Sequence, residues 1–267
     1  YLFIHTSILR NLYVSLLSKE VNLPIEKWED EGLRIASEKY LLENPSIIKT
    51  EKDYKMYFHD KENIYVATSS DGLNWQIIEK PIFTRATGPV IVDLPDGKLR
   101  LYFYPLDLGG PYKSAISEDG INFEIEEGIR FEPRKDSFAS VEAIGHPQII
   151  RVNNLYLLYF DNGASPTKLK ATAVNNKCEF LYEENKGAIP EIHYAYSNDG
   201  LNWTYGGKVI KFKQVSIPDF LGGWSPGVLK VNDKYLMYFH VSRTRVITTQ
   251  KGDVTNCKIE AVLDPLW

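Results

Sequence analysis

The chain has 267 residues but only two cysteines, Cys178 and Cys257, and two methionines. Two cysteines are too few for the disulfide framework of a small secreted domain, and their spacing is not that of a zinc site, although they can meet in space as one bridge. Long apolar runs are also missing, since no stretch approaches the about 18 residues of a membrane-spanning helix. The sequence therefore predicts neither a membrane span nor a structural zinc.

Charge of one sign is not concentrated anywhere in the sequence. Lys and Arg number 31, Asp and Glu 35, and the formal net charge is −4 with no long basic run. Because nucleic-acid binders neutralise phosphates with clustered basic residues, no nucleic acid partner is expected. The first residues lack the features of a signal peptide, but the chain begins at Tyr1 within a strand-like run, so processing would hide an export signal. We expect a soluble protein, with a cytoplasmic or a secreted location both open.

Aromatic residues are abundant. They make up 13% of the chain, with 17 Tyr and 12 Phe, a composition that favours half-buried strands over helices. One large all-β domain fits this length better than two small ones. We therefore predict an all-β chain in which residues 1–267 form a single domain.

Three segments share one turn pattern, with Ser first, Asp-Gly at the third and fourth positions, and an aromatic residue at the seventh. Gly adopts a positive φ without steric cost and Asp bonds its own backbone, so each segment is predicted to be a hairpin turn. A folding role is therefore expected for these Asp residues, on the face opposite the largest pocket. The segments are 69–75, 117–123 and 197–203.

A second element recurs four times: a residue followed by Pro, a β-branched run, a turn, and a strand with Tyr-Phe. Joined to the Asp-Gly turn it defines four strands, A to D, in about 40 residues, the size of a propeller blade. The copies begin at Asn44-Pro45, Gly88-Pro89, His146-Pro147 and Ser225-Pro226, and their Tyr-Phe pairs begin at Tyr57, Tyr102, Tyr159 and Tyr238.

An imperfect fifth copy opens the chain. Tyr1–His5 is predicted to be its strand B, Leu12–Leu17 its strand C, and Trp28 the start of its strand D. Its strand A is missing. Asp264-Pro265 either supplies that strand and closes the ring, or is a frayed tail beside an incomplete blade. The repeats thus predict a five-bladed β-propeller of four-stranded antiparallel blades.

Polar residues recur where the strands of each unit meet one end of the ring. Loops and strand ends on one face of a rigid scaffold are where binding sites collect, so we predict a ligand funnel there, although solvated strand ends are the alternative. Trp224 stacks on a sugar in one interpretation and packs between blades in the other. His193, within a strand C, is predicted to be structural. The predicted funnel residues after strand B are His5, His59, Tyr104, Asp161 and His240, and those opening strand A are Asn44, Gly88, His146, Ser225 and Asp264.

These motifs resemble the five-bladed glycosidase propellers of arabinanases, xylosidases, invertases and mannoside phosphorylases. The resemblance is carried by Asn44–Ile48, Tyr57-Phe58 and Ser69–Trp75, echoed through nearly the whole chain. The Asp-Gly turns also resemble the Asp-box turns of sialidase-type propellers, one residue shorter. The resemblance implies a carbohydrate substrate and three funnel carboxylates: an Asp base or nucleophile, an orienting Asp, and a Glu acid.

The sequence departs from that pattern at the strand A starts. Asn44, Gly88, His146 and Ser225 are not carboxylates, and only Asp264-Pro265 keeps the Asp-Pro form of the family. Glu43 matches the Glu-x-Pro form of the acid. Insertions at residues 130–146, 161–191 and 211–225 enlarge the same face, and the second of these is expected to wall or cover the pocket.

The leading hypothesis is a glycoside hydrolase that uses two carboxyls, one to donate a proton and one ionised. A phosphorylase, with Arg85, Arg134 and Arg243 binding phosphate, and a catalytically silent propeller that binds a glycan or a protein are the alternatives. No metal or other cofactor is expected, since no ligand spacing supports one. The proton donor is Glu142 or Glu43, the ionised partner is Asp161 or Asp264, and the predicted sugar-binding residues are His5, His59, Arg85, Tyr104, His146, Trp224, His240 and Arg243.

Overall fold

The computed structural model describes residues 12–13, 32–108, 111–132, 144–163, 171–180, 191–210, 220–231, 234–251 and 253–261. Within these ranges every regular element is a strand apart from one short 3-10 helix, η2 (Leu106–Leu108). No helix in the described ranges is long and apolar enough to cross a membrane. The predicted all-β class is confirmed.

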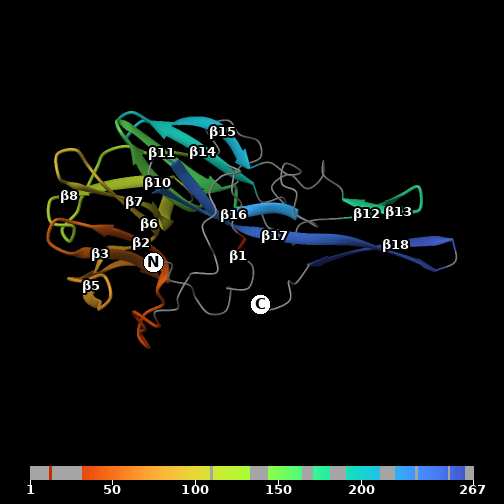
Figure 1. Cartoon of the computed structure of the whole chain (residues 1–267), viewed down its shortest axis with the longest axis horizontal. Helices are drawn as coiled ribbons and strands as arrows, with labels where there is room; N and C mark the ends of the chain where they lie inside the picture. Colours follow the sequence, from red (N-terminus) through yellow and green to blue (C-terminus); the bar gives the residue numbers. More distant parts are fainter. Residues whose placement is uncertain are drawn as a thin grey trace.

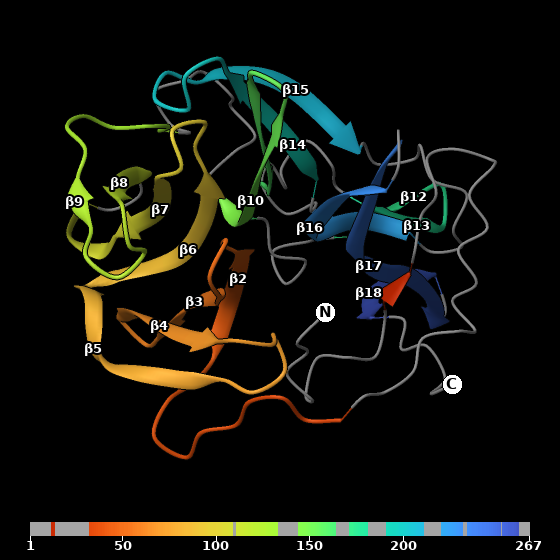
Figure 2. The same ribbon diagram turned by 60° about the vertical axis from the view of Figure 1, so that its left-hand side comes forward.

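Four four-stranded antiparallel sheets, beside one two-stranded hairpin, form the described part of the chain, and the inner strands of the four surround one axis (Figure 1, Figure 2). The predicted order of strands A to D holds in the first three, where each strand pairs with the next. The first sheet holds β2 (Glu43–Lys49), β3 (Tyr54–Asp60), β4 (Asn63–Ser69) and β5 (Gln76–Thr84); the second holds β6 (Ala86–Asp93), β7 (Leu99–Pro105), β8 (Lys113–Ser117) and β9 (Glu124–Ile125); the third holds β10 (Gly145–Val152), β11 (Leu155–Asp161), β14 (Ile192–Ser197) and β15 (Thr204–Ile210); the fourth holds β16 (Phe220–Val231), β17 (Lys234–Lys251), β1 (Leu12–Tyr13) and β18 (Val254–Ala261).

The N-terminal strand β1 belongs to the fourth sheet. Leu12 pairs with His240 and Tyr13 with Phe239, so the prediction that Leu12–Leu17 forms the third strand of a separate first blade is wrong for these two residues. The reason lies in β17, which runs on past the sheet to pair with β18 and leaves its edge at Phe239–His240 free to accept β1. Tyr1–His5, Trp28 and Asp264-Pro265, on which the fifth blade was predicted, lie outside the described residues.

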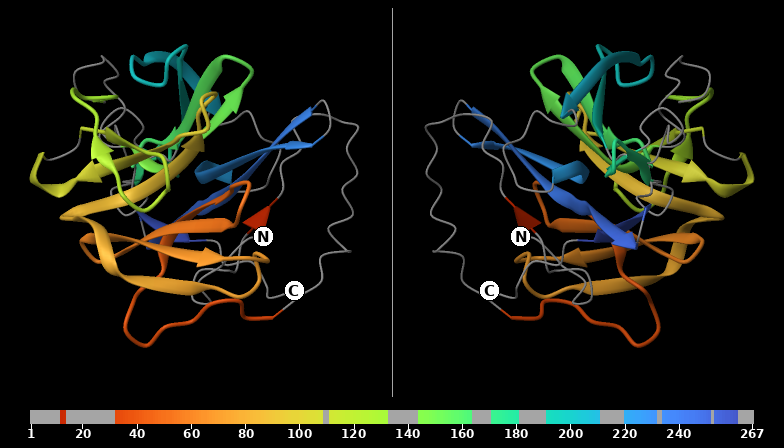
Figure 3. Two further views of the ribbon diagram at one scale, coloured as in Figure 1. Left: turned by 90° about the vertical axis from the view of Figure 1, so that its left-hand side faces the viewer. Right: turned by 90° about the vertical axis from the view of Figure 1, so that its right-hand side faces the viewer.

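The first strands of successive sheets lie side by side, β2 against β6, β6 against β10, and β10 against β16 (Figure 3). Side chains join neighbouring strands at their polar ends. Ser46 Oγ accepts a hydrogen bond of 3.1 Å from the Ile91 N–H, and Gln148 Nε2 donates one of 3.1 Å to the Val228 carbonyl. These bonds hold the inner strands in fixed positions around the axis.

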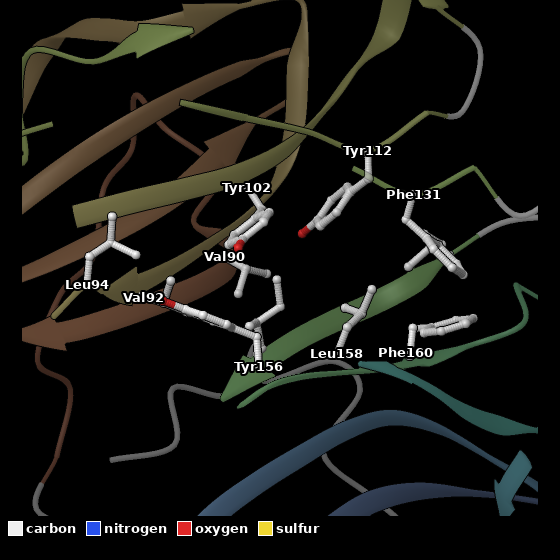
Figure 4. Close-up of a cluster of buried hydrophobic side chains, with 12 residues drawn as sticks. Val90, Val92, Leu94, Tyr102, Tyr112, Phe131, Tyr156, Leu158 and Phe160 are labelled. Carbon is white, nitrogen blue, oxygen red and sulfur yellow. The ribbon is translucent and has the colours of Figure 1, made fainter. Parts of the chain in front are cut away.

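Aromatic side chains fill the spaces between the sheets. Phe83 and Phe103 stack between the first two sheets with ring centroids 4.5 Å apart. Burying such rings stabilises the fold by roughly 1.5–3 kcal/mol per side chain. A second cluster joins the second and third sheets (Figure 4), and its members include Val90, Tyr102, Tyr112, Phe131, Tyr156, Leu158 and Phe160.

The three Asp-Gly turns have the predicted folding role. Asp71 Oδ1 accepts hydrogen bonds of 2.8 Å from the N–H groups of Leu73 and Asn74, and these bonds hold the pKa of Asp71 well below its usual range. The turn joins β4 to β5, so it lies at the end of the sheet opposite the start of β2. The carboxylate is thus committed to the turn.

Tyrosines link the Asp119 and Asp199 turns to the preceding sheet. Tyr57 Oη donates a hydrogen bond of 2.8 Å to the Gly120 carbonyl, and Tyr102 Oη donates one of 2.8 Å to the Gly200 carbonyl. Both tyrosines are buried. These two turns therefore also fix the distances between the first and second sheets and between the second and third.

A disulfide joins two hairpins that extend from the sheets (Figure 1). Cys178 in the hairpin of β12 (Ala171–Val174) and β13 (Lys177–Phe180) is bonded to Cys257 in β18. The bridge, one of two outcomes left open by the sequence, is confirmed. The hairpin of residues 171–180, within the 161–191 insertion, packs against β17 and β18. For this hairpin the expectation that the insertion covers the pocket is wrong, because the disulfide holds it on the extended β17–β18 hairpin.

The turn glycines provide a test of this arrangement. Gly200 and Gly72 have φ of 71° and 76°, but a Cβ on Gly200 would lie 2.6 Å from Arg100 Nη1 and from Tyr102 Oη, whereas a Cβ on Gly72 would meet Tyr54 at an ordinary 3.5 Å. Backbone strain of about 1 kcal/mol is common to both alanine variants, and Gly200→Ala adds overpacking of about 1–3 kcal/mol. Urea unfolding should give the larger loss for Gly200→Ala. Equal losses would contradict the tight contact between sheets.

Candidate functional site

A cavity of about 380 Å³ lies where the inner strands of the four sheets begin. Its walls are the four residue-Pro segments that the repeats identified, so the predicted funnel is present. The lining residues are Asn44–Ile47, Gly88–Ile91, His146–Ile149 and Ser225–Gly227.

The residue before each proline has an unusual backbone conformation. Asn44, Gly88, His146 and Ser225 all have positive φ, at 47°, 61°, 42° and 48°, and the pairing of each strand shifts register there. A residue before Pro normally stays extended, and positive φ costs a non-glycine residue roughly 1 kcal/mol or more. The same strained bulge recurs four times beside one cavity. We therefore interpret it as a feature that shapes the site.

Four residues on the second strands occupy one equivalent position. His59 pairs with Glu43, Tyr104 with Thr87, Asp161 with Gly145, and His240 with Trp224. Four of the five residues in the predicted polar ring therefore occupy equivalent positions in the four sheets. The residue two before each proline sits directly opposite a member of this ring.

Asp161 and His146 form the shortest of the ion pairs at this site. His146 Nδ1 donates to Asp161 Oδ2 at 2.7 Å, and the Asp161 side chain is 2% exposed while that of His146 is 43% exposed. Two backbone N–H groups also bind the carboxylate: Ser225 donates to Oδ2 at 3.1 Å and Gly163 to Oδ1 at 3.0 Å. Gly145 opposite leaves no room for a Cβ beside the carboxyl.

These contacts set the ionisation of both groups. Burial alone would raise the pKa of Asp161, but the hydrogen bond and charge of His146, together with the two N–H donors, lower it. The bond to Asp161 raises the pKa of His146 against the effect of burial. The carboxylate is thus ionised, and it favours the protonated imidazole.

A second imidazole–carboxyl contact lies on the first sheet. His59 Nε2 is 3.3 Å from Glu43 Oε2, and the Gly88 N–H donates to His59 Nδ1 at 3.4 Å. Since Nδ1 accepts, the neutral ring carries its proton on Nε2, the nitrogen that faces Glu43. Burial lowers the pKa of His59 and outweighs the carboxylates of Glu43 and Asp60. Glu43 is the more accessible carboxyl, with 48% of its side chain exposed.

Aromatic groups complete the ring. The Trp224 and His240 rings lie 6.4 Å apart, and the Trp224 indole nitrogen is buried without a hydrogen-bond partner among the described residues. Burial and the nearby His146 lower the pKa of His240. Tyr104 donates its hydroxyl proton to the Ile144 carbonyl, and burial raises its pKa.

The remaining predicted site residues are placed differently. Arg85 is bound to Asp107 at 2.5 Å and to Glu62 at 3.3 Å, and it does not line the cavity. His5, Glu142 and Asp264 lie outside the described residues, and for Arg243 only the backbone of β17 is described. No group of three or more His, Cys, Asp or Glu that could hold a metal occurs among the residues described.

His193 is structural, as the sequence predicts. It is fully buried, its Nδ1 lies 2.9 Å from the Tyr205 hydroxyl, and its ring stacks on Phe160. Burial lowers its pKa to about 4, so the ring is neutral in the core.

A larger cavity, of about 640 Å³, lies beside the Asp71 turn. The expectation that the Asp-Gly turns lie away from the largest pocket is therefore wrong for the Asp71 turn, which borders the larger of these two cavities. This cavity exists because residues around Arg34 pass over the outer side of the first sheet, where Ile35, Tyr40 and Leu42 pack on its core. Its carboxylate Asp53 is bound to Thr50 and Lys55, so it offers no second free carboxyl.

Sequence comparison does not assign this chain: no protein-family model and no curated protein matches it. Solved structures do match in fold. The endo-arabinase from Bacteroides thetaiotaomicron VPI-5482 is 12% identical with a TM-score of 0.54, over 89% of this chain and 82% of that one. A thermostable family-43 glycoside hydrolase is 14% identical with a TM-score of 0.53, over 83% and 75% of the two chains.

A third similar structure comes from the family-130 mannoside phosphorylases. That family contains glycoside hydrolases that target β-1,2 mannosidic linkages in Candida mannan. The structure is 14% identical with a TM-score of 0.50, over 77% of this chain and 61% of that one. These structures belong to the five-bladed β-propeller glycosidase superfamily. The resemblance predicted from the sequence is confirmed for the fold, which is a β-propeller.

The His146–Asp161 pair predicts how stability varies with pH. Because the pKa of His146 is raised by folding, the pair stabilises fully below the unfolded pKa of about 6.5 and loses its effect as pH rises through the folded value. Because that of Asp161 is lowered, the effect is present above about 3.9 and is lost as pH falls through the folded value. His146→Gln should therefore destabilise more at pH 5.5 than at pH 9.

His240→Gln is the matched control for this measurement. Since folding lowers the pKa of His240, its replacement should destabilise less as the pH falls, which is the opposite trend. Urea unfolding of both variants and the parent at several pH values checks this. The same trend in both variants would rule out the ion pair as its cause.

Proposed function

We propose that this protein is a glycoside-active enzyme: a single five-bladed propeller of residues 1–267 that cleaves a glycosidic bond in its central cavity. One observation carries the proposal. Glu43, a half-exposed carboxyl, opens the first strand of the first sheet opposite His59, and Asp161, a buried ionised one, ends the second strand of the third sheet opposite Gly145, so both lie at the same end of the sheets. The glycosidase-like propeller fold supports a carbohydrate substrate.

Glycoside cleavage requires one group to protonate the leaving oxygen and another to activate or replace the attacking water. Glu43 is the accessible carboxyl, and its Oε2 lies 3.3 Å from His59 Nε2. Asp161 supplies the permanent negative charge on the third sheet. Glu142 and Asp264 stay as proposed alternatives for the two roles.

Sugar binding is assigned to the aromatic and imidazole groups of the same ring. The Trp224 indole offers an apolar face for a sugar ring, and His59, His146 and His240 offer hydrogen-bond partners for hydroxyls.

Of the proposed phosphate ligands of a phosphorylase, Arg85 is already paired with two carboxylates. Hydrolysis is therefore favoured over phosphorolysis. Assays with and without phosphate separate the two. The disulfide also favours maturation in an oxidising compartment.

A catalytically silent propeller that binds a glycan or a protein is the second candidate. The observation that favours it is the burial of Asp161, whose two oxygens together accept three hydrogen bonds. A carboxylate bound in this way does not reach a sugar directly. Binding without turnover in a broad screen of oligosaccharides would select this candidate.

The proton-transfer role of Glu43 is tested by replacement with Gln. Turnover of an unactivated oligosaccharide should fall by about 100-fold or more, the usual scale for a positioned acid or base, while sugar binding and thermal unfolding stay unchanged. Glu142→Gln is the matched variant because the two residues are candidates for one role. Full activity in both variants, on a substrate the parent cleaves, would show that neither residue is the acid.

A further inference from the structure

His146 has three properties that no other residue of the four residue-Pro segments combines. It lines the cavity, 43% of its side chain is exposed, and Nδ1 is bound to a buried carboxylate. Because Nδ1–H donates to Asp161, Nε2 is the ring nitrogen left for chemistry, and it has no hydrogen-bond partner among the described residues. A basic nitrogen is thereby held at the cavity with its tautomer fixed.

Asp161 acts through that imidazole. Its carboxylate is 2% exposed, and both of its oxygens are occupied by His146, Ser225 and Gly163. No part of it is available to a sugar or to an attacking water. Its position and charge orient His146 and stabilise the imidazolium form, which defines a positioning residue.

We propose that His146 is the general base of this site and that Asp161 is its positioning residue. The proposal rests on the proposed glycosidase function and deepens it. In the reaction, Nε2 takes a proton from water as the water oxygen bonds to the anomeric carbon. The glycosidic C–O bond breaks, its electron pair goes to the leaving oxygen, and that oxygen takes a proton from Glu43. Solvent then returns the proton from His146 to Glu43, so protons balance.

The groups around His146 suit this role. Among the described residues, the titratable groups that interact with His146 are Asp161 from β11 and His240 from β17, while Tyr104 from β7 faces Asp161 and its hydroxyl is bound to the Ile144 carbonyl. Because burial and His146 itself disfavour protonation of His240, Asp161 is the one charged partner among these groups at neutral pH. A single carboxylate contact therefore controls the basicity of His146.

The backbone makes a clean deletion possible. His146 has φ of 42°, and the equivalent position on the second sheet is Gly88 with φ of 61°. Gly is thus accepted at this bulge, and His146→Gly removes the imidazole with relief of backbone strain. On the nitrophenyl glycoside that the parent cleaves fastest, kcat/KM should fall about 100-fold or more. Added imidazole should restore at least a tenth of the lost rate, and an absence of rescue would overturn the proposal.

The leaving group separates His146 from Glu43. Nitrophenolate leaves without protonation, so Glu43→Gln should lose far less activity on nitrophenyl glycosides than on unactivated oligosaccharides. His146→Gly should lose activity on both, because a base is needed for each. Equal losses of His146→Gly and Glu43→Gln on nitrophenyl substrates would contradict the separate roles.

The pH profile tests the positioning role of Asp161. The base must be neutral to accept a proton, so kcat/KM should fall on the acid side of the His146 pKa, and Asp161→Asn should move this limb to lower pH. Asp107→Asn, which alters an exposed carboxylate outside the cavity, should leave the limb in place. An acid limb that Asp161→Asn does not move would overturn the proposal.

A measurement without substrate separates a failure of the His146–Asp161 proposal from a failure of the proposed glycosidase function. Diethyl pyrocarbonate reacts with neutral imidazole, so its rate at His146 between pH 5 and 9, followed by peptide mass spectrometry, reports the pKa of that ring. Asp161→Asn should shift the midpoint down. An unmoved midpoint in a protein that does cleave glycosides overturns the His146–Asp161 proposal alone. Failure to cleave any glycoside overturns the proposed function and the base role with it.

Discussion

One proline in each inner strand, near the start of β2, β6 and β10 and midway along β16, constrains everything built around the cavity. A proline has no N–H to give to the neighbouring strand, so the pairing breaks there and each sheet accommodates a bulge. The bulge places the preceding residue at positive φ on the cavity wall. Because this interruption of strand pairing recurs in four sheets, the residues before the four prolines are brought together in a ring around the cavity. Aromatic packing and the tyrosine–turn bonds hold that ring at a fixed radius.

Much of the fold was predictable because its signals are local. An Asp-Gly turn needs only its own seven residues, and the Asp71, Asp119 and Asp199 turns form as the sequence predicts. Residue-Pro starts and Tyr-Phe strands are likewise read from neighbours in the chain. The placement of β1 was not predictable in this way, because its partner, β17, is more than 200 residues away in the sequence. The pattern of hydrophobic residues in a strand also does not say which strand edge it pairs with.

The candidate site was predictable in its positions and not in its contacts. The equivalence of His59, Tyr104, Asp161 and His240 follows from the repeat. The pairing of His146 with Asp161 depends on the bulge and on Gly145, whose missing side chain makes room for the carboxylate. The run Gly145-His146-Pro147 carried that signal, since the other sheets have Glu43, Thr87 and Trp224 where this sheet has glycine.

The pairing of β1 with β17 also bears on how the protein is made. Leu12 and Tyr13 leave the ribosome before every other described strand, and their partners His240 and Phe239 emerge only after the strands of the first three sheets. Contacts between such remote segments close a very large loop, so they form late and slowly compared with the hairpins of the first three sheets. The hairpins of the first three sheets can therefore assemble before β17 emerges, and the fourth sheet is completed only after the last of its strands has emerged.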